Sequence, residues 1–326
     1  MSALVSIIIC TRNRAENLRA CLQDIGKLAV PERWTVELLV VDNGSTDHTH
    51  AVVKEVQLIN MNLRYVSEPK AGVSRARNTG LAAAQGEIIL FTDDDLSPDR
   101  DWLWKIGTPL LKGNCDAAVA TVKLAEHLER PWLEPVHKAW LAVPGASGDA
   151  ELELTGASMG FHRSVLKRVP AFDPELGGGA IGFGEDTLFS WQICEADCRL
   201  RRVPDALAVH HPDPSRLLRS QWLAAAGQRG LSAAYLLHHW QHGELRNPLL
   251  CAWYFAAKLR LRRILQPPVP MEAEGCAPWE MSYVLTIYKC RQFLKERRRP
   301  RNYSRRGLVR LEGRLDNRPA ATGLRF

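Results

Sequence analysis

The chain has 326 residues, of which 46% are hydrophobic and 24% are charged, close to the values of ordinary globular proteins. This composition excludes a disordered, collagen-like or coiled-coil protein. The length suits a catalytic domain with an appendage, because single cores stop growing near about 250–300 residues. The 43 basic and 36 acidic residues give a net charge of +7, and the excess lies in the segment from Lys289 to Arg310, which holds ten basic residues and one acidic residue.

Three further features of the sequence indicate the cellular compartment of the protein. The N-terminus has no basic leader before its short apolar run, and the eight cysteines include no CxxC pair. No stretch reaches the roughly 18–20 apolar residues of a membrane-spanning helix. We therefore expect a reduced, cytoplasmic protein, with peripheral contact at the inner membrane face left open.

Strand-like and helical patterns alternate in the first hundred residues. Runs rich in β-branched residues predict strands, and apolar residues three or four apart predict helices. The strands are expected at 5–10, 36–41, 63–66 and 87–92, and the helices at 15–28, 47–56 and 73–84. This alternation predicts an α/β fold with a mostly parallel sheet flanked by helices. From about Leu217 the pattern becomes helical to the end, with a break at 266–270.

Polar clusters follow three of the predicted strands. They are the segments 11–13 (Thr-Arg-Asn), 42–45 (Asp-Asn-Gly-Ser) and 93–95 (Asp-Asp-Asp). In parallel sheets the ligand site forms beyond the carboxyl ends of the strands. We therefore expect the three segments to converge on one cleft.

The run Asp93, Asp94 and Asp95 is the sharpest local feature. Adjacent carboxylates repel one another unless a cation neutralises them, and their oxygens suit Mg²⁺ or Mn²⁺. The alternative is a solvated acidic loop, which the position after a buried strand disfavours. A metal held by few carboxylates completes its shell with substrate phosphates. This favours a nucleotide diphosphate ligand, although neither GxxxxGK[ST] nor GxGxxG is present.

Two later segments carry further candidate groups. Glu185 and Asp186 follow a glycine-flanked phenylalanine at the start of a predicted helix, where acids either cap the helix or supply a general base. His210 and His211 follow a strand-like run. An adjacent histidine pair is more often structural, but one of the two imidazoles is a candidate metal ligand if the acidic run holds a cation.

Taken in order, six segments resemble the family 2 glycosyltransferases with the GT-A fold. The resemblance covers about residues 3–215 and rests on VSIIICTRNR (5–14), VVDNGSTDHT (40–49), GVSRARNTGLAAAQGEIILFTDDD (72–95), TGASMGFHRSVL (155–166), GFGEDTLFSWQI (182–193) and VHH (209–211).

The resemblance implies a nucleotide-sugar donor, with UDP-sugars favoured, and Mn²⁺ or Mg²⁺ as cofactor. The residues it assigns to the donor nucleotide are Thr11, Arg12, Asn13, Asp42, Asn43, Ser45, Arg75, Asp93 and Asp94. Arg77 and Asn78 are expected to fix the loop instead. The metal ligands are expected to be Asp93 and Asp95, with His210 or His211. Three successive aspartates leave open whether Asp94 or Asp95 is the main metal contact.

The resemblance also implies a chemistry. Asp186 is expected to be the catalytic base and Glu185 to hold the acceptor or the loop. The segment Gly156, Ala157, Ser158 and Met159 is expected to border the sugar and the acceptor. Processive relatives carry QxxRW and spanning helices; residues 219–222 read RSQW here, which favours addition of a single sugar. The expected activity is an inverting, non-processive transfer to a glycan or lipid-linked acceptor in polysaccharide or cell-envelope biosynthesis.

The expected domains are a catalytic domain over 1–215 and a helical, basic extension over 216–326. Trp253, Tyr254 and Phe255, followed by four cations, predict either an interfacial helix on an anionic membrane or a helix packed on the catalytic domain. The tail after Leu294 is expected to be a disordered basic arm. It supports a nucleic-acid-binding alternative, which we do not favour because no nucleic-acid module precedes it. A non-catalytic carbohydrate-binding relative is the other alternative.

Overall fold

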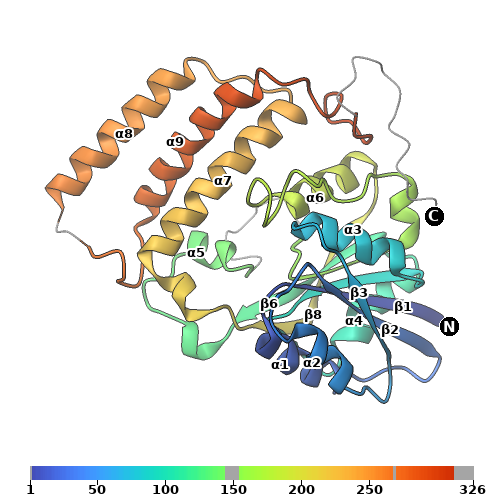
Figure 1. The fold of residues 1–326 in the computed structure, drawn as a ribbon. Helices are drawn as coiled ribbons and strands as arrows, with labels where there is room; N and C mark the ends of the chain where they lie inside the picture. Colours follow the sequence, from blue (N-terminus) through green and yellow to red (C-terminus); the bar gives the residue numbers. More distant parts are fainter. Residues whose placement is uncertain (1, 144–153, 267–268, 312–326) are drawn as a thin grey trace.

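The computed structural model describes residues 2–143, 154–266 and 269–311. Within them, an eight-stranded sheet has the order β3-β2-β1-β4-β7-β6-β8-β5 (Figure 1). The strands are β1 (Ala3–Thr11), β2 (Trp34–Asp42), β3 (Asn62–Ser67), β4 (Ile88–Asp93), β5 (Leu96–Pro98), β6 (Ala117–Leu124), β7 (Ser158–His162) and β8 (Leu200–His210). The first four strands pair in parallel, and β7 runs antiparallel to both of its neighbours. The predicted mostly parallel α/β sheet is confirmed.

Helices cover both faces of the sheet because side chains alternate along each strand. In β1, Ile7 and Ile9 pack with α1, α2 and α4, whereas Ile8 packs with α3 and α6 on the other face. The helices are α1 (Ala15–Ile25), α2 (Thr49–Glu55), α3 (Val73–Ala83), α4 (Trp102–Leu111), α5 (Pro135–Trp140) and α6 (Glu185–Glu195). The second predicted helix starts two residues late: His48 is its N-cap, and Asp47 lies before the helix, where its carboxylate accepts from the N–H of Thr49 in a turn.

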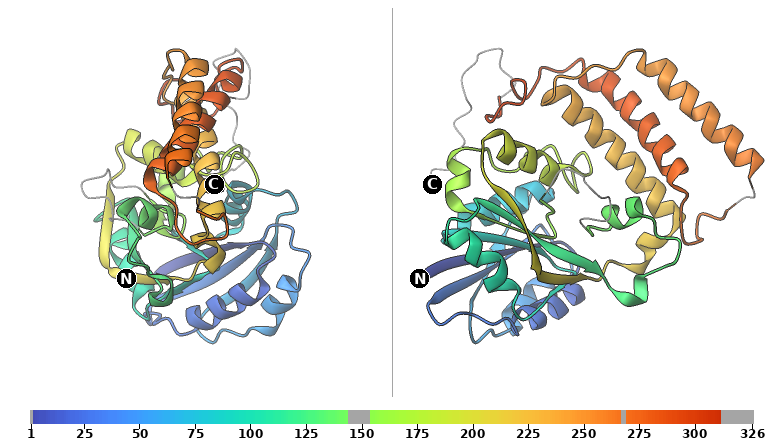
Figure 2. Two further views of the ribbon diagram at one scale, coloured as in Figure 1. Left: turned by 90° about the vertical axis from the view of Figure 1, so that its left-hand side faces the viewer. Right: turned by 180° about the vertical axis from the view of Figure 1, so that it is seen from behind.

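Three long helices form a layer beside the α/β body: α7 (Arg219–His239), α8 (Pro248–Leu265) and α9 (Pro278–Glu296) (Figure 2). The first part of α7 packs Trp222 and Ala226 into an apolar cluster with the 124–141 segment, and its last part packs against α6. Helix α9 lies between α7 and α8. Among the described residues, helix α8 therefore packs mainly on α9. No helix of the described residues is long and apolar enough to cross a bilayer.

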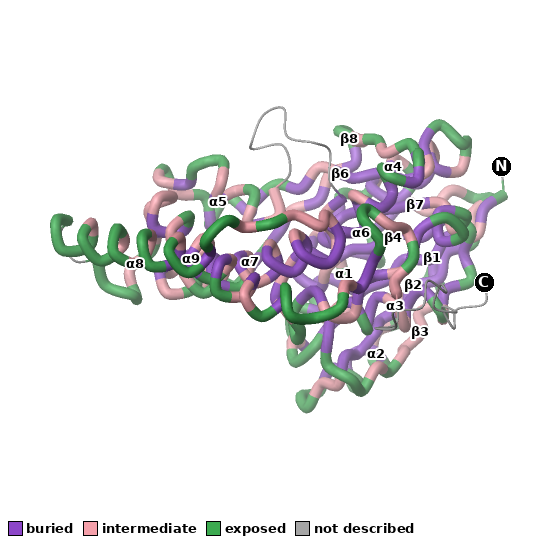
Figure 3. The backbone as a smooth tube through the Cα atoms, turned by 90° about the horizontal axis from the view of Figure 1, so that it is seen from above, coloured by how far each residue is buried: buried purple, intermediate pink, exposed green. Residues whose placement is uncertain are grey.

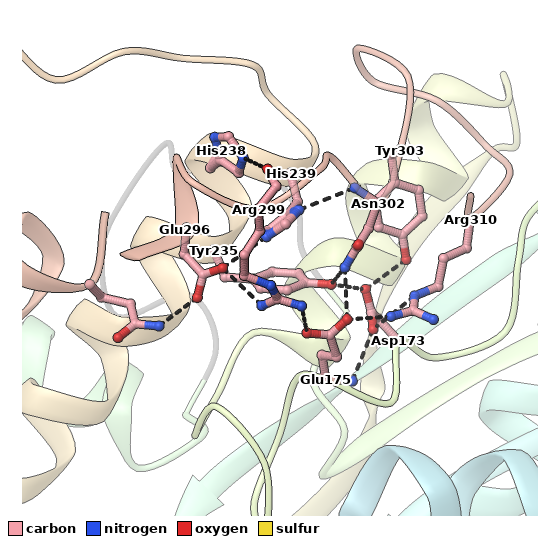
Figure 4. A network of polar contacts seen from close by, with 11 residues as sticks. Asp173, Glu175, Tyr235, His238, His239, Glu296, Arg299, Asn302, Tyr303 and Arg310 are labelled. Carbon is pink, nitrogen blue, oxygen red and sulfur yellow. Dashed lines mark hydrogen bonds and ion pairs between the residues drawn. The ribbon is translucent and has the colours of Figure 1, made fainter. Parts of the chain in front are cut away.

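The expectation of a disordered basic arm is wrong for the described part of the tail. Residues 289–296 complete α9, and residues 297–311 return to the α/β body, where Asn302 and Tyr303 are buried. Arg299 and Arg310 both pair with Glu175 (Figure 4). These two cations of the tail therefore neutralise an acid of the same chain. Residues 312–326 of the predicted extension lie outside the described residues.

Candidate active site

A cleft of about 630 Å³ opens at the carboxyl ends of β1 and β4. Its walls come from the 154–157 segment, the glycine-rich loop before α6, the end of α5 and the middle of α7. Of the sequence-predicted residues, those that line it are Thr11, Arg12, Asn43, Asp93, Asp94, Asp95, Gly156, Ala157, Glu185, Asp186 and His210. The predicted convergence of distant segments is therefore present in the fold.

The acidic run ends β4 and turns into β5. The Thr11 hydroxyl donates to Asp94 over 2.6 Å, and the Arg14 guanidinium donates to Asp94 over 2.6 Å and to Asp95 over 2.7 Å. Burial raises the pKa of Asp94 to about 7, against the charge of Arg14. Burial also acts to raise the pKa of Asp95, but a hydrogen bond from His210 and the charge of Arg14 hold that pKa below its ordinary value.

The two adjacent histidines point to different places. His210 ends β8 and pairs with Leu96 of β5, which brings its Nε2 to 3.3 Å from Asp95 Oδ1. Its Nδ1 lies 2.8 Å from the carbonyl oxygen of Leu141, which requires a proton on Nδ1. His211 is exposed and its ring stacks on His127, outside the cleft. The structure therefore brings His210, and not His211, to the acidic run.

The donor set fits a hard divalent cation. His210 Nε2 and Asp95 Oδ1 face each other beside the acidic run, and an imidazole nitrogen and a carboxylate oxygen are both ligands of divalent cations. Two neighbouring ligand atoms of an octahedral Mg²⁺, each at about 2.1 Å from the ion, lie about 3 Å from each other. The observed distance between His210 Nε2 and Asp95 Oδ1 is similar, at 3.3 Å. Among the described residues, no three His, Cys, Asp or Glu side chains form a complete metal site. Water and diphosphate oxygens would therefore supply the remaining ligands.

Most of the polar residues after β2 are engaged with the protein. Asp42 is buried and accepts from the Ser45 N–H over 2.8 Å and the Tyr65 hydroxyl over 2.7 Å. The Asn43 amide donates to the carbonyls of Glu68 and Lys70. Asn13 and Ser45 bond to the neighbouring loop, with Asn13 N–H donating to Ser45 Oγ over 2.9 Å. Asp42, Asn13 and Ser45 thus shape the loops without lining the cleft.

The two arginines of α3 have different surroundings. Arg75 is exposed and does not line the cleft. Arg77 is buried, and its Nη1 lies 2.9 Å from Glu185 Oε1. Gly156 permits this position of Arg77, because a Cβ at Gly156 would overlap the guanidinium. Arg77 thus holds both the 154–157 segment and the start of α6.

The Glu185 and Asp186 pair begins α6, after Gly184, whose φ of +93° disfavours other residues. Burial raises the pKa of Glu185 to about 7, assisted by the charge of Asp186 and opposed by Arg77. Asp186 accepts from the backbone N–H groups of Gly156 at 3.1 Å and Thr187 at 2.8 Å. Asp186 is therefore an acceptor at the cleft wall without a paired cation among the described residues.

Two residues predicted to border the acceptor do not reach the cleft. Ser158 and Met159 lie in β7 and are fully buried. Ser158 Oγ accepts from the indole N–H of Trp102 at 2.8 Å, and Met159 belongs to the core beneath α3 and α6. Only Gly156 and Ala157 of the predicted segment line the cleft.

Three arginines of the cleft were missed by the sequence analysis. Arg14 binds the acidic run. Arg216 follows β8, and among the described residues its side chain makes one long contact, of 3.4 Å, to the carbonyl oxygen of Trp140. Burial lowers the pKa of Arg216. Arg229 of α7 stacks between Trp140 and Phe183, at 4.8 and 4.5 Å from their ring centroids. Arg14 lies inside the segment 5–14, where no role was assigned to it, and Arg216 and Arg229 lie outside the six segments.

The glycine-rich wall of the cleft is tied to the C-terminal segment (Figure 4). Asp173 Oδ2 accepts from the hydroxyls of Tyr235 at 2.6 Å and Tyr303 at 2.8 Å. Glu175 pairs with Arg299 and Arg310, at 2.5 Å each. Because these acids immediately precede Gly177–Gly179, the 297–311 segment fixes one wall of the cleft.

Comparisons with known proteins agree with this fold. The model of glycosyl transferase family 2 matches residues 6–170, about half of the chain. The chain belongs to glycosyl transferase family 2. The pre-mycofactocin glycosyltransferase of Mycobacterium tuberculosis is 30% identical over 258 residues, which cover 76% of this chain and 50% of that relative. The succinoglycan biosynthesis protein ExoM of Rhizobium meliloti is 28% identical over 253 residues, 73% of this chain and 77% of ExoM.

Among solved structures, the mannosyltransferase PcManGT of Pyrobaculum calidifontis, in complex with GDP-Man and Mn²⁺, has a TM-score of 0.54 at 22% identity. The match covers 90% of this chain and 70% of PcManGT, and it shows that the chain has the GT-A fold. The chain spans about half, or less, of the length of several curated relatives that it matches.

Proposed function

We propose that this chain is an inverting, non-processive and metal-dependent glycosyltransferase that moves one sugar from a nucleotide-sugar donor to a glycan or lipid-linked acceptor. The observation that carries the proposal is the meeting, in one cleft, of an acidic run beside His210 with the Glu185 and Asp186 pair. A cation site supports binding of a diphosphate, and a separate carboxylate supports activation of a hydroxyl.

In this proposal Asp186 is the base. It accepts the proton of the acceptor hydroxyl while that oxygen bonds to the anomeric carbon, and the bond from this carbon to the diphosphate oxygen breaks. Attack from the face opposite the diphosphate inverts the configuration. Glu185 is held by Arg77 at 2.9 Å and positions the start of α6. The backbone N–H of Gly156 orients the Asp186 carboxylate.

Asp95 and His210 would hold Mn²⁺ or Mg²⁺, with Asp93 beside them. The cation would supply positive charge to the departing nucleoside diphosphate. Arg216 supports the same role from the protein, because its half-buried side chain lines the cleft and makes one long contact to a carbonyl oxygen. Thr11 and Arg14 keep the acidic run in place.

The donor class is nucleotide sugars, with UDP-sugars favoured and GDP-mannose, the donor bound to PcManGT, as the first competitor. Exopolysaccharide or cell-envelope synthesis is the proposed setting, supported by the relative that is named for succinoglycan biosynthesis. Addition of a single sugar is supported by the absence of QxxRW at residues 219–222.

The test is thermal unfolding with UDP-, GDP- and dTDP-sugars, each with Mn²⁺ and with chelator, because a ligand of the native state raises apparent stability. We expect a shift with one nucleotide class that chelation removes. Turnover by the wild type that Asp186→Asn abolishes, with the donor shift retained, separates the enzyme from a non-catalytic relative. A folded protein that responds to no donor would overturn the proposal.

A further inference from the structure

Helix α8 carries an apolar face that the described part of the protein leaves uncovered. Leu250, Trp253, Ala257, Leu261 and Ile264 follow one another at spacings of three or four residues, which places them on one side of the helix. Trp253 is 77% exposed and Ile264 is 72% exposed. Figure 3 shows that α8 is exposed along nearly its whole length. A contiguous exposed stripe of this kind marks an interaction surface.

The charges on α8 have one sign. The helix contains Lys258, Arg260, Arg262 and Arg263 and no acidic residue. Arg263 pairs with Glu280 of α9, whereas the other three have no acidic partner among the described residues. Arg262 instead stacks on Trp279, 4.3 Å from the ring centroid. The apolar stripe is therefore accompanied by unneutralised positive charge.

A groove of about 550 Å³ between α8 and α9 adjoins this face. Its floor is apolar, with Leu259, Val284 and Ile287, and Arg260 and Arg291 stand at its sides. No acidic residue is among its described lining. The apolar floor of this groove suits an acyl chain, and the arginines at its sides suit an anionic headgroup.

We infer that the outer face of α8 binds the surface of an anionic lipid bilayer, with the helix in the plane of the interface. The exposed Trp253 and Tyr254 suit the headgroup level, and the cations suit anionic lipid. A second copy of the chain fits less well. A symmetric dimer through this face would place the cations of both copies together with no acid to pair them.

The helical layer connects this face with the cleft. Helix α8 packs on α9 and α9 on α7, and Gln228, Arg229 and Ser232 of α7 line the cleft. Binding of α8 would hold the cleft at a fixed height beside a membrane, where a lipid-linked acceptor is found. The inference does not depend on the proposed function, since vesicle binding is measured without donor or acceptor.

The experiment is sedimentation of the full chain with vesicles of phosphatidylcholine alone or with about 30% phosphatidylglycerol, at about 50 and about 500 mM NaCl. We expect binding to the anionic vesicles that high salt weakens. The combined variant Trp253→Ser, Leu261→Ser and Ile264→Ser should bind at least about tenfold more weakly, because it removes the apolar contact. Lys258→Gln with Arg260→Gln should weaken binding and reduce its salt dependence.

Matched controls distinguish binding through the outer face of α8 from non-specific adsorption to vesicles. Ile59→Ser removes a fully exposed apolar side chain far from α8 in the chain, and Arg33→Gln with Lys54→Gln removes two exposed cations of the catalytic body. These controls should bind as the wild type does. The inference fails if folded wild type does not bind anionic vesicles at low salt, or if the α8 variants bind unchanged. It also fails if wild type is a dimer that the serine variant dissociates.

Discussion

Arg77 and Glu185 form a buried ion pair of 2.9 Å at the start of α6, and this pair gives two adjacent carboxylates different surroundings. Glu185 has a cation as its partner, whereas Asp186 accepts only from backbone N–H groups among the described residues. A general base needs a carboxylate oxygen that can accept a proton from the substrate, whereas a positioning group is fixed by a partner in the protein. The geometry thus favours Asp186 for the proton and Glu185 for position.

This division predicts unequal effects of two isosteric changes. Asp186→Asn should lower kcat by about 10²–10⁴, the usual loss for a general base, with the donor Kd unchanged. Glu185→Gln keeps an acceptor for Arg77 and should lower kcat less. Steady-state kinetics with the donor identified by the thermal panel measures both. The reverse order of losses would assign the base to Glu185.

Glu185 also predicts a pH dependence of folding. Its pKa is raised from 4.5 to about 7, so between these values the native state binds more protons than the unfolded state. The stability contribution of this group therefore falls as pH rises from about 4.5 to 7. The free energy of unfolding of Glu185→Gln, relative to wild type, should rise across that window by about 2–3 kcal/mol. Urea titrations from pH 5 to 8 measure it, and a pH-independent difference would contradict it.

The sequence was sufficient for the first four strands of the sheet and for the polar segments that follow three of them. Buried strands such as Ile88–Asp93 read as continuous apolar runs, and parallel strands bring their carboxyl ends together. The acidic run could therefore be predicted to lie in a cleft with the segments after the first two strands, whereas the Glu185 and Asp186 pair was assigned to the site through the resemblance.

Other features depend on packing that no local pattern records. His210 and His211 are equivalent in sequence, and only the antiparallel register with Leu96 directs His210 to Asp95. Arg216 reaches the cleft because of the turn after β8. The tail was misread because two of its cations, Arg299 and Arg310, pair with Glu175, which lies 135 residues before Arg310. Such long-range pairs leave no periodicity in the sequence.

The register of β8 predicts which histidine affects metal binding. His210→Gln and Asp95→Asn should each weaken Mn²⁺ binding by about tenfold or more, because each removes a proposed ligand. His211→Gln should bind Mn²⁺ as wild type does, since the His211 ring faces His127. Electron paramagnetic resonance of free Mn²⁺ measures this without turnover. Equal losses for both histidine variants would contradict the assignment.

The C-terminal segment predicts an effect on the cleft from a residue outside it. The Tyr303 hydroxyl donates to Asp173 at 2.8 Å. The loop after Asp173 is in turn bonded to α3: the Ser74 hydroxyl donates to the carbonyl of Leu176, and the Val73 N–H donates to the carbonyl of Gly178. Tyr303→Phe should lower the free energy of unfolding by about 1–3 kcal/mol, because a buried carboxylate loses a donor.

The same change should raise the donor KM more than it lowers kcat, because Gly178 and Gly179 line the cleft while Asp186 is untouched. Tyr288→Phe is the matched control, since Tyr288 is 44% exposed and its hydroxyl makes no hydrogen bond within the described part of the protein. This control should change neither quantity. Urea unfolding and steady-state kinetics on both variants decide the matter. If Tyr303→Phe has the same free energy of unfolding and the same donor KM as Tyr288→Phe, the 297–311 segment covers the α/β body without fixing the cleft wall.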